Sequence, residues 1–305
     1  MNEPAAPRKT TVIESARLSA YLGAAVTLVS ETFQHTGSFK FRAAYHLASL
    51  VPQAKIICAS SGNFGQALAY ACGLLGKSCM VVMPNTSSRV KVDAVKGFGG
   101  EVELVDTSRK SRAARVAELA AEFPDAYVAS AYDDPLVIRG NASLGREIAD
   151  LDRGFAGVVV PVGGGGLSAG VITGLREAGS STPVIGAEPA LANDAARSLQ
   201  AGMILSNDGE PQTIADGART LSLGQHNWAV LRNGMERIVE VPEAEIRTAV
   251  RLLFDLANLK AEPTGALALA ALLTDIGRFR GREVCCVVSG GNVDPELYCD
   301  ILGGG

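Results

Sequence analysis

Four consecutive glycines, Gly163, Gly164, Gly165 and Gly166, follow a β-branched run and precede an apolar helical pattern that starts at Leu167. This order of buried strand, glycine turn and helix leaves backbone N–H groups unpaired at a helix N-terminus. The unpaired groups and the positive end of the helix dipole both favour an anion. Glycine costs order and buries little surface, so we expect this run to bind a phosphate rather than to serve packing.

Two other interpretations of this stretch are a membrane span and a dinucleotide-binding turn. Residues 155–175 carry no charge and are long enough for a membrane span, but a proline and four glycines interrupt the middle. Gly164, Gly166 and Ala169 fit the dinucleotide pattern G-x-G-x-x-A, and the acidic residue Glu188 follows about 20 residues later. From this stretch alone, a nicotinamide enzyme is therefore an open alternative.

Lys40 lies between two phenylalanines, Phe39 and Phe41, at the predicted start of a helix that Ser38 or Thr36 is expected to cap. An apolar surround and the positive helix end both disfavour an ammonium group, so both lower the pKa of the lysine. A neutral amine is what a Schiff base with a carbonyl group requires. Lys40 is therefore a candidate nucleophile and base.

The surrounding pattern predicts the elements that position these residues. Residues 10–24 are expected to be helical, and residues 26–33 to form a strand that leads to Lys40. From Lys55 onward, strands alternate with helices, which predicts parallel sheets with right-handed crossovers. Two further glycine-containing turns, SSGN at residues 60–63 and SGGN at residues 289–292, each follow a predicted strand.

Seven motifs occur in a family-specific order: TGSFKFR, SSGN, PVGGGGL, GAEP, TIADG, EPTGA and SGGN. In this order they resemble the pyridoxal-phosphate-dependent serine/threonine dehydratases and serine racemases, which are tryptophan-synthase-β-like enzymes of fold type II. The resemblance covers nearly the whole chain and leaves the nicotinamide enzyme a remote alternative. It implies two three-layer α/β domains, with the smaller, mobile one (55–132) inserted in the larger one (1–54 and 133–305).

The resemblance also implies a role for each motif residue. Lys40 would bond covalently to pyridoxal 5′-phosphate and, once freed by the substrate, would remove the Cα proton. Phe39 would pack against the pyridine ring, and Asn63 would bind the 3-oxygen of the ring. The segment Gly163–Leu167 would hold the phosphate. Ser289 would face the pyridine nitrogen, where a hydroxyl group makes the ring a milder electron sink than a carboxylate would.

The loop after the strand that begins at Lys55 is expected to bind the substrate through Ser60, Ser61, Gly62 and Phe64. Ser61 would act as a second catalytic residue on the cofactor face opposite the lysine. Phe64 replaces the histidine that is usual in dehydratases, and Ala43 replaces a usual glycine. The phenylalanine puts the identity of the substrate in doubt more than the chemistry.

Glu188 and Asp194 frame a candidate cation site, with the carbonyl of Ala192 as a third ligand. Oxygen ligands of this kind suit Mg²⁺ or Ca²⁺, and metal-dependent relatives of the resembled family carry a similar E-P-x-x-A-x-D segment. The alternative is a helix start, with Asp194 or Asn193 as the cap and Glu188 in a surface ion pair.

The predicted function is that of an ammonia-lyase (dehydratase), which converts L-serine, L-threonine or 3-hydroxyaspartate to a 2-oxo acid and ammonia. An amino-acid racemase acting on serine or aspartate at the same residues is the alternative. The chain ends soon after the SGGN motif, so we expect no C-terminal regulatory domain.

Composition narrows the partners. The 305 residues are 47% hydrophobic with a formal net charge of −4 and no basic run, which argues against nucleic acid as a partner. Six cysteines without C-x-x-C spacing fit a reduced, cytoplasmic setting, and the N-terminus carries no apolar signal segment. We expect a small amino-acid substrate, no membrane association and a homodimer.

Overall fold

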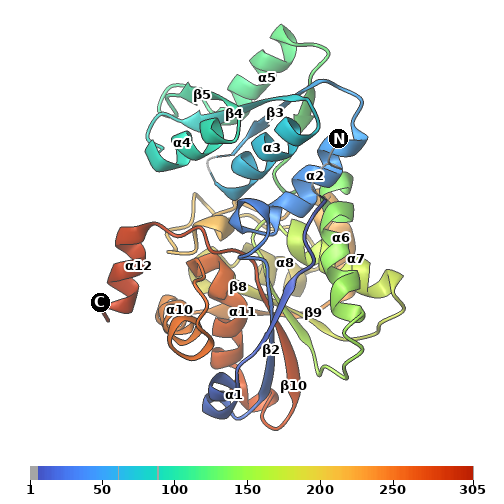
Figure 1. The fold of residues 1–305 in the computed structure, drawn as a ribbon, viewed down its shortest axis with the longest axis vertical. Helices are drawn as coiled ribbons and strands as arrows, with labels where there is room; N and C mark the ends of the chain where they lie inside the picture. The colour runs from blue at the N-terminus through green and yellow to red at the C-terminus, as the bar shows by residue number, and fades with distance from the viewer. Residues whose placement is uncertain (1–5, 61, 88, 305) are drawn as a thin grey trace.

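The computed structural model describes residues 6–60, 62–87 and 89–304, which form two sheets, one above the other in Figure 1. The larger sheet has six strands in the order β1-β2-β10-β7-β8-β9, and the smaller has four in the order β5-β4-β3-β6. The strands are β1 (Thr11–Glu14), β2 (Ala25–Ser30), β3 (Lys55–Ala59), β4 (Ser78–Pro84), β5 (Glu101–Val105), β6 (Tyr127–Ala129), β7 (Val158–Pro161), β8 (Val184–Pro189), β9 (Met235–Val241) and β10 (Glu283–Val288).

Every neighbouring pair of strands is parallel except β1 and β2. The helical prediction for residues 10–24 was therefore wrong in its first part, because Thr11–Glu14 is an antiparallel edge strand and only Ala16–Leu22 is helical. The segment TVIE contains three β-branched residues and alternates in burial, which suits a strand with one face covered.

Helices cover both faces of the larger sheet. Val158 and Val160 of β7 pack into one buried cluster, whereas Val159 packs into the other, so the sheet lies between two apolar layers. The helices are α1 (Ala16–Leu22), α2 (Lys40–Leu50), α3 (Asn63–Leu74), α4 (Arg89–Gly97), α5 (Arg112–Glu122), α6 (Pro135–Ala149), α7 (Gly166–Glu177), α8 (Asp194–Ala201), α9 (Gln225–Gly234), α10 (Glu243–Ala257), α11 (Pro263–Thr274) and α12 (Pro295–Leu302).

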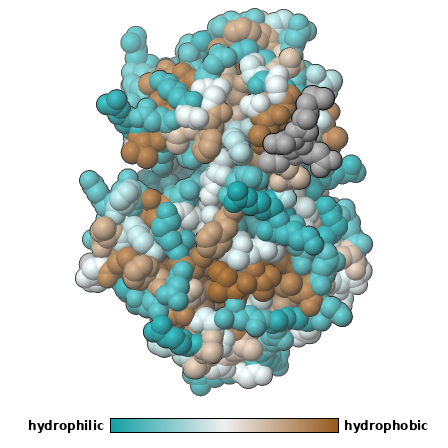
Figure 2. All heavy atoms as spheres, in the orientation of Figure 1, coloured by the Kyte–Doolittle hydropathy of each residue, from teal (hydrophilic) through white to brown (hydrophobic). Residues whose placement is uncertain are grey.

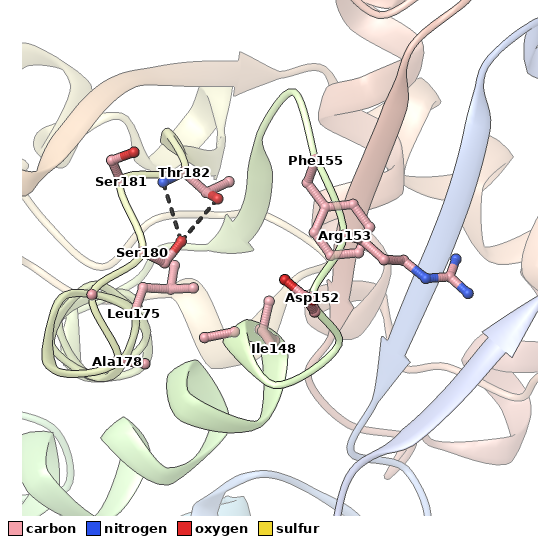
Figure 3. A pocket seen from close by; sticks show the side chains of 11 residues that line it. Ile148, Asp152, Arg153, Phe155, Leu175, Ala178, Ser180, Ser181 and Thr182 are labelled. Atoms are coloured by element: carbon pink, nitrogen blue, oxygen red, sulfur yellow. Dashed lines mark hydrogen bonds between the residues drawn. The ribbon is translucent and has the colours of Figure 1, made fainter.

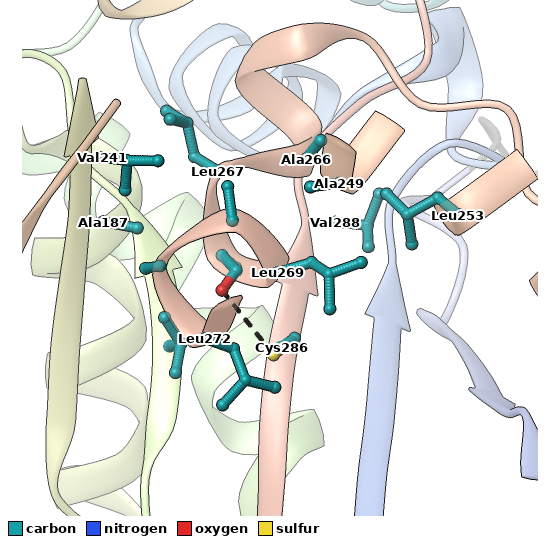
Figure 4. Packing of buried hydrophobic residues seen from close by; sticks show 14 of the residues in the cluster. Ala187, Val241, Ala249, Leu253, Ala266, Leu267, Leu269, Leu272, Cys286 and Val288 are labelled. Atoms are coloured by element: carbon teal, nitrogen blue, oxygen red, sulfur yellow. Dashed lines mark hydrogen bonds between the residues drawn. The ribbon is translucent and has the colours of Figure 1, made fainter. Parts of the chain in front are cut away.

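Helix α11 is buried along most of its length, and Figure 4 shows its leucines against the sheet and α10. Leu267, Leu269 and Leu272 are fully buried, and the thiol of Cys286 in β10 approaches the carbonyl of Ala268 at 3.9 Å. A helix enclosed in this way cannot shift without exposing apolar surface. The residue at its N-terminus, Glu262, is consequently held in a fixed place.

The chemistry-bearing segments follow the carboxyl ends of adjacent parallel strands. β2 leads to Lys40, β7 leads to the glycine run, and β10, which lies between them, leads to Ser289. In open parallel sheets, the carboxyl ends of the strands meet at one edge, and ligands bind there. The topology therefore brings three sequence motifs that lie more than a hundred residues apart to one edge of the sheet.

Candidate active site

The amine of Lys40 points into the space between the two sheets. Nζ donates a hydrogen bond of 2.9 Å to the carbonyl of Ala131, which follows β6 of the smaller sheet. The ring of Phe39 lies 5.0 Å from Nζ, and the ring of Phe64 lies 5.8 Å from it. Burial lowers the pKa of Lys40 to about 8, and the nearby carboxyl group of Glu262 acts in the opposite direction.

The predicted direction of this pKa shift is confirmed, but two details of the prediction are wrong. Phe41 packs away from the amine, against His35 and Tyr45, and Phe64 takes its place beside the lysine. Neither Thr36 nor Ser38 caps helix α2, whose first turn has no side-chain cap. Both hydroxyl groups are buried without a hydrogen-bond partner among the described residues.

The glycine run forms a turn between β7 and α7, and Gly165 at the helix N-cap has a positive φ of 92°. The N–H groups of Gly163, Gly164 and Gly165 have no hydrogen-bond partner within the described part of the chain. The carbonyls of the turn, in contrast, are held. Gly164 O accepts from Gly224 N at 3.1 Å and from Asn227 Nδ2 at 2.7 Å. The turn thus presents free donors at a helix N-terminus, as a phosphate requires.

The prediction that these glycines have no packing role is wrong. A Cβ atom on Gly164 would lie 2.2 Å from the ring of Tyr132, and one on Gly163 would lie 3.0 Å from Gly217 O. The first distance is far inside van der Waals contact and the second is tighter than an ordinary contact, so a larger residue at either position would require its neighbours to shift. Asn227, which is fully buried and also donates to Tyr132 O at 3.1 Å, ties the same residues together. No motif in the sequence points to this asparagine.

Asn63 begins helix α3 and is held from both sides. Its Nδ2 donates to the carboxyl oxygens of Glu262 at 2.9 and 3.2 Å, and its Oδ1 accepts from Asn292 Nδ2 at 2.8 Å. Glu262 is 5% exposed, and burial raises its pKa to about 8, helped by the negative charge of Asp216. The EPTGA, TIADG and SGGN motifs contain Glu262, Asp216 and Asn292, but sequence reasoning gave none of the three a role.

Ser289 follows β10 and is 1% exposed. Its hydroxyl group has no hydrogen-bond partner among the residues that the structure describes. An unpartnered buried hydroxyl is costly, so a bound group that pairs with it would remove the penalty. The predicted contact between Ser289 and a ring nitrogen fits this observation.

The predicted substrate loop is only partly described. Ser60 accepts hydrogen bonds from Gly62 N at 3.4 Å and Gly65 N at 3.1 Å, so its hydroxyl fastens the start of α3. Gly62 is the N-cap of that helix, and a Cβ atom there would meet no neighbour within 4 Å. Phe64 is almost completely buried but keeps its ring near Lys40. Ser61 lies outside the described residues.

The candidate cation ligands lie at the end of β8. Glu188 and Asp194 are each 1% exposed, and Ala192 between them is also buried. Asp194 Oδ1 accepts from Asn207 Nδ2 at 2.8 Å, whereas Oδ2 is buried without a partner among the described residues. Burial raises the pKa of Asp194 to about 6, and burial together with Asp194 raises that of Glu188. A bound cation would favour the ionised form of both carboxyl groups and so lower their pKa values.

The helix-cap alternative is confirmed in part: Asn193 occupies the N-cap position of α8, but its side chain makes no cap hydrogen bond. The surface pair is wrong, because the buried Glu188 accepts from the N–H groups of Ala195 and Ala196, both at 2.9 Å. Asn193 bonds Glu240 and Arg197 instead. Among residues 6–60, 62–87 and 89–304, no three His, Cys, Asp or Glu side chains converge to hold a metal ion. The cation therefore stays a prediction.

A pocket of about 350 Å³ lies at the other edge of the larger sheet (Figure 3). Its walls include Asp152 and Phe155, which precede β7, and Ser180 and Thr182, which precede β8. Ser180 and Thr182 bond each other at 2.9 Å, so their polar groups are satisfied within the protein. The pocket lies at the amino ends of the strands, and it does not contain the predicted catalytic residues.

Comparison with known proteins identifies the family. The family model for pyridoxal-phosphate dependent enzymes matches residues 5–290. This chain belongs to that family. It is 35% identical to an L-threo-3-hydroxyaspartate ammonia-lyase of Pseudomonas sp over 300 residues, 97% of this chain and 93% of the relative. It is also 35% identical to the serine racemase of Homo sapiens, over 93% of this chain and 86% of that one.

Among solved structures, a threonine deaminase from T.th. superposes with a TM-score of 0.89 at 38% identity, over 94% of both chains. The fold is that of the fold-type-II pyridoxal-phosphate enzymes, and the predicted family and fold class are confirmed. Of the residues described, no helix is both long and apolar enough to cross a membrane.

The residues at the carboxyl ends of β2, β7 and β10 fit pyridoxal phosphate. The free N–H groups of the glycine turn suit its phosphate, the buried hydroxyl of Ser289 lacks a partner within the described part of the chain, and Lys40 has a lowered pKa. Each of these features is unusual in a protein interior, and one ligand explains all three.

Proposed function

We propose that this enzyme is an ammonia-lyase that converts a β-hydroxy amino acid, namely L-serine, L-threonine or 3-hydroxyaspartate, to a 2-oxo acid and ammonia. The observation that carries the proposal is the buried Lys40 amine, with its pKa lowered to about 8, on a segment that follows β2, next to the strands that lead to Ser289 and to the glycine turn. The ammonia-lyase and deaminase names of the relatives at 35–38% identity support the same chemistry.

Pyridoxal phosphate, when bound, supplies an electron-withdrawing ring that stabilises negative charge at the substrate Cα. Lys40 accepts the Cα proton, and an amine with a pKa near neutrality is suited to hold it. The Cβ–O bond then breaks, and the leaving oxygen takes a proton and departs as water. That water is regained when ammonia leaves, so the products are one 2-oxo acid and one ammonia.

The other residues hold the cofactor and the substrate in position. The glycine turn binds the phosphate through Gly163–Leu167, and Phe39 lies between Lys40 and the larger sheet's apolar cluster. Asn63 would bind the ring 3-oxygen through its Nδ2 group, because its Oδ1 is taken by Asn292, while Glu262 holds the amide in place. Ser60, Gly62 and Phe64 border the space where the substrate would lie.

A racemase is the second candidate, because serine racemases match this chain at up to 35% identity and use of Lys40 would be the same. In that reaction, a proton returns to Cα from the face opposite the lysine, and Ser61 is the proposed donor. Ser61→Ala should suppress racemisation while elimination from the L-substrate persists in part. An equal loss of both activities with the cofactor still bound would exclude this role.

We further propose a cation, Mg²⁺ or Ca²⁺, bound by Glu188, Asp194 and the carbonyl of Ala192. The Oδ2 atom of Asp194, unpartnered among the described residues, supports this site.

A homodimer and a mobile smaller domain (55–132), inserted in a larger one (1–54 and 133–305), are also proposed. Exposed apolar surface supports the homodimer. Figure 2 shows an apolar band across the lower half of one face. Elsewhere in the chain, Tyr21 and Phe33 are more than half exposed. Six free cysteines favour a cytoplasmic location.

The purified protein tests the main proposal directly. It should be yellow, with an absorbance band at about 410 nm that borohydride bleaches, because the cofactor is bound through a lysine nitrogen. A panel of L- and D-β-hydroxy amino acids should then give keto-acid release for at least one L-substrate. A colourless protein that gains neither absorbance nor activity with added pyridoxal phosphate would refute the proposal.

A further inference from the structure

Glu262 is a buried, titratable residue to which the reaction as described gives no task. It lies at the N-cap of α11, 5% exposed, and its two carboxyl oxygens take the Nδ2 group of Asn63 at 2.9 and 3.2 Å. Its own N–H donates to Gly290 O at 3.1 Å, so its main chain is fixed beside Ser289. A buried carboxyl group is rarely retained without a partner or a purpose.

The contact fixes which way the Asn63 amide faces. Oδ1 accepts from Asn292 Nδ2 at 2.8 Å, and Asn292 Nδ2 also donates to Thr36 O at 2.7 Å. A flipped Asn63 amide would place its Nδ2 against the Asn292 donor, which is repulsive, and its Oδ1 against the Glu262 oxygens, which is repulsive when Glu262 is ionised. Glu262 and Asn292 together therefore fix the Asn63 amide, with Nδ2 on the Glu262 side and Oδ1 on the Asn292 side.

Charged groups from two other elements act on the same carboxyl group. Asp216, at the start of the short 3₁₀ helix Asp216–Ala218, raises its pKa, whereas Lys91 of α4 lowers it. Lys40 of α2 is affected in turn, because the carboxyl charge favours its protonated form. Lys91 Nζ and Asp216 Oδ2 lie 3.2 Å apart, so one ion pair joins the smaller half of the molecule to the larger half.

We propose that Glu262 is a positioning residue of the active site that orients the Asn63 amide toward the cofactor. The protonation state of Glu262 also sets the pH at which the lysine nitrogen of the cofactor-loaded site loses its proton. The proposal rests on the roles proposed above for Lys40 and Asn63. Negative charge on Glu262 favours a proton on the neighbouring lysine nitrogen, and loss of that charge removes this effect. The residue acts through Asn63 and Lys40, and it needs no contact with the substrate.

The test is an absorbance titration of the cofactor-loaded protein between about pH 6 and 10. The native enzyme should show a spectral transition with a midpoint near the Glu262 pKa of about 8. Glu262→Gln keeps an acceptor for Asn63 but cannot titrate, so the cofactor should stay bound while the transition disappears or moves by more than about one pH unit. Glu262→Ala removes the acceptor as well, and cofactor affinity should fall about tenfold.

Asp216→Asn and Lys91→Met supply a second test at half-exposed positions, where the fold tolerates change. Loss of the Asp216 charge should move the midpoint to lower pH, and loss of the Lys91 charge should move it to higher pH. Both variants break the same ion pair. If that ion pair served only to hold the two halves together, the two variants would move the midpoint of the titration in the same direction.

Three results would overturn the proposal: an unchanged transition in Glu262→Gln, shifts of equal sign in the two charge variants, or unaltered cofactor affinity in Glu262→Ala. Failure of the underlying function would look different. In that case the native protein would not bind pyridoxal phosphate through Lys40 at all, and borohydride would fix no cofactor to it.

Discussion

The glycine turn and the Lys40 cluster both lie at the carboxyl ends of strands of the larger sheet but are built in different ways. The turn comes from one continuous stretch, and the larger half of the molecule holds its Gly164 carbonyl through Asn227 and Gly224. The Lys40 cluster is assembled from distant segments of both halves, since Asn63 and Glu262 are 199 residues apart. The first site is prepared by local backbone geometry, whereas the second depends on how the two halves meet.

The largest effect should come from breaking the assembled cluster at its centre. Lys40→Ala removes the covalent anchor and the base together, so elimination and racemisation should fall by about 10⁴-fold or more. Keto-acid release and borohydride fixation measure this. Lys110→Ala, which removes an exposed lysine paired with Glu118, is the matched control and should stay near wild type. Activity near wild type in Lys40→Ala without added amine would overturn the assignment.

The next largest effect should come from the local site. In Gly164→Ala, the new Cβ would meet the Tyr132 ring at 2.2 Å, and overpacking of this kind costs about 1–3 kcal/mol. The melting temperature and the affinity for pyridoxal phosphate should both fall, because the turn must move to admit the methyl group. Gly154→Ala is the control, since its Cβ would meet nothing within 4 Å. Equal behaviour of the two variants would show that the turn is not tightly packed.

This contrast explains what the sequence could and could not reveal. Strand, glycine turn and helix follow one another along the chain, so periodicity and composition predict the turn and its anion preference. The partners of Asn63 could not be found in this way, because nothing local to residues 60–66 indicates a carboxyl group at the start of α11. The missed edge strand at Thr11–Glu14 has the same cause, since its pairing with β2 decides its conformation.

The cation site sharpens the comparison, because it belongs wholly to the larger half. If a divalent ion binds the carboxyl groups of Glu188 and Asp194, its removal by a chelator should lower the melting temperature by about 5 °C, and Mg²⁺ or Ca²⁺ should restore it. Asp194→Ala should abolish that response. Asp150→Ala, at the exposed end of α6, should keep it. The site is no cation site if EDTA changes neither stability nor activity of a metal-stripped preparation.

The smallest effect concerns the substrate side of the assembled cluster. The ring of Phe64 lies 5.8 Å from the Lys40 amine and offers no donor to a second carboxylate. Phe64→His adds one, so kcat/KM for 3-hydroxyaspartate relative to threonine should rise by about tenfold. Phe64→Leu keeps the site apolar and should not produce this gain, which separates the new donor from the loss of the ring. Several relatives are named for hydroxyaspartate, so the native ratio decides the matter. A native preference for hydroxyaspartate that Phe64→His leaves unchanged would show that another residue receives the second carboxylate.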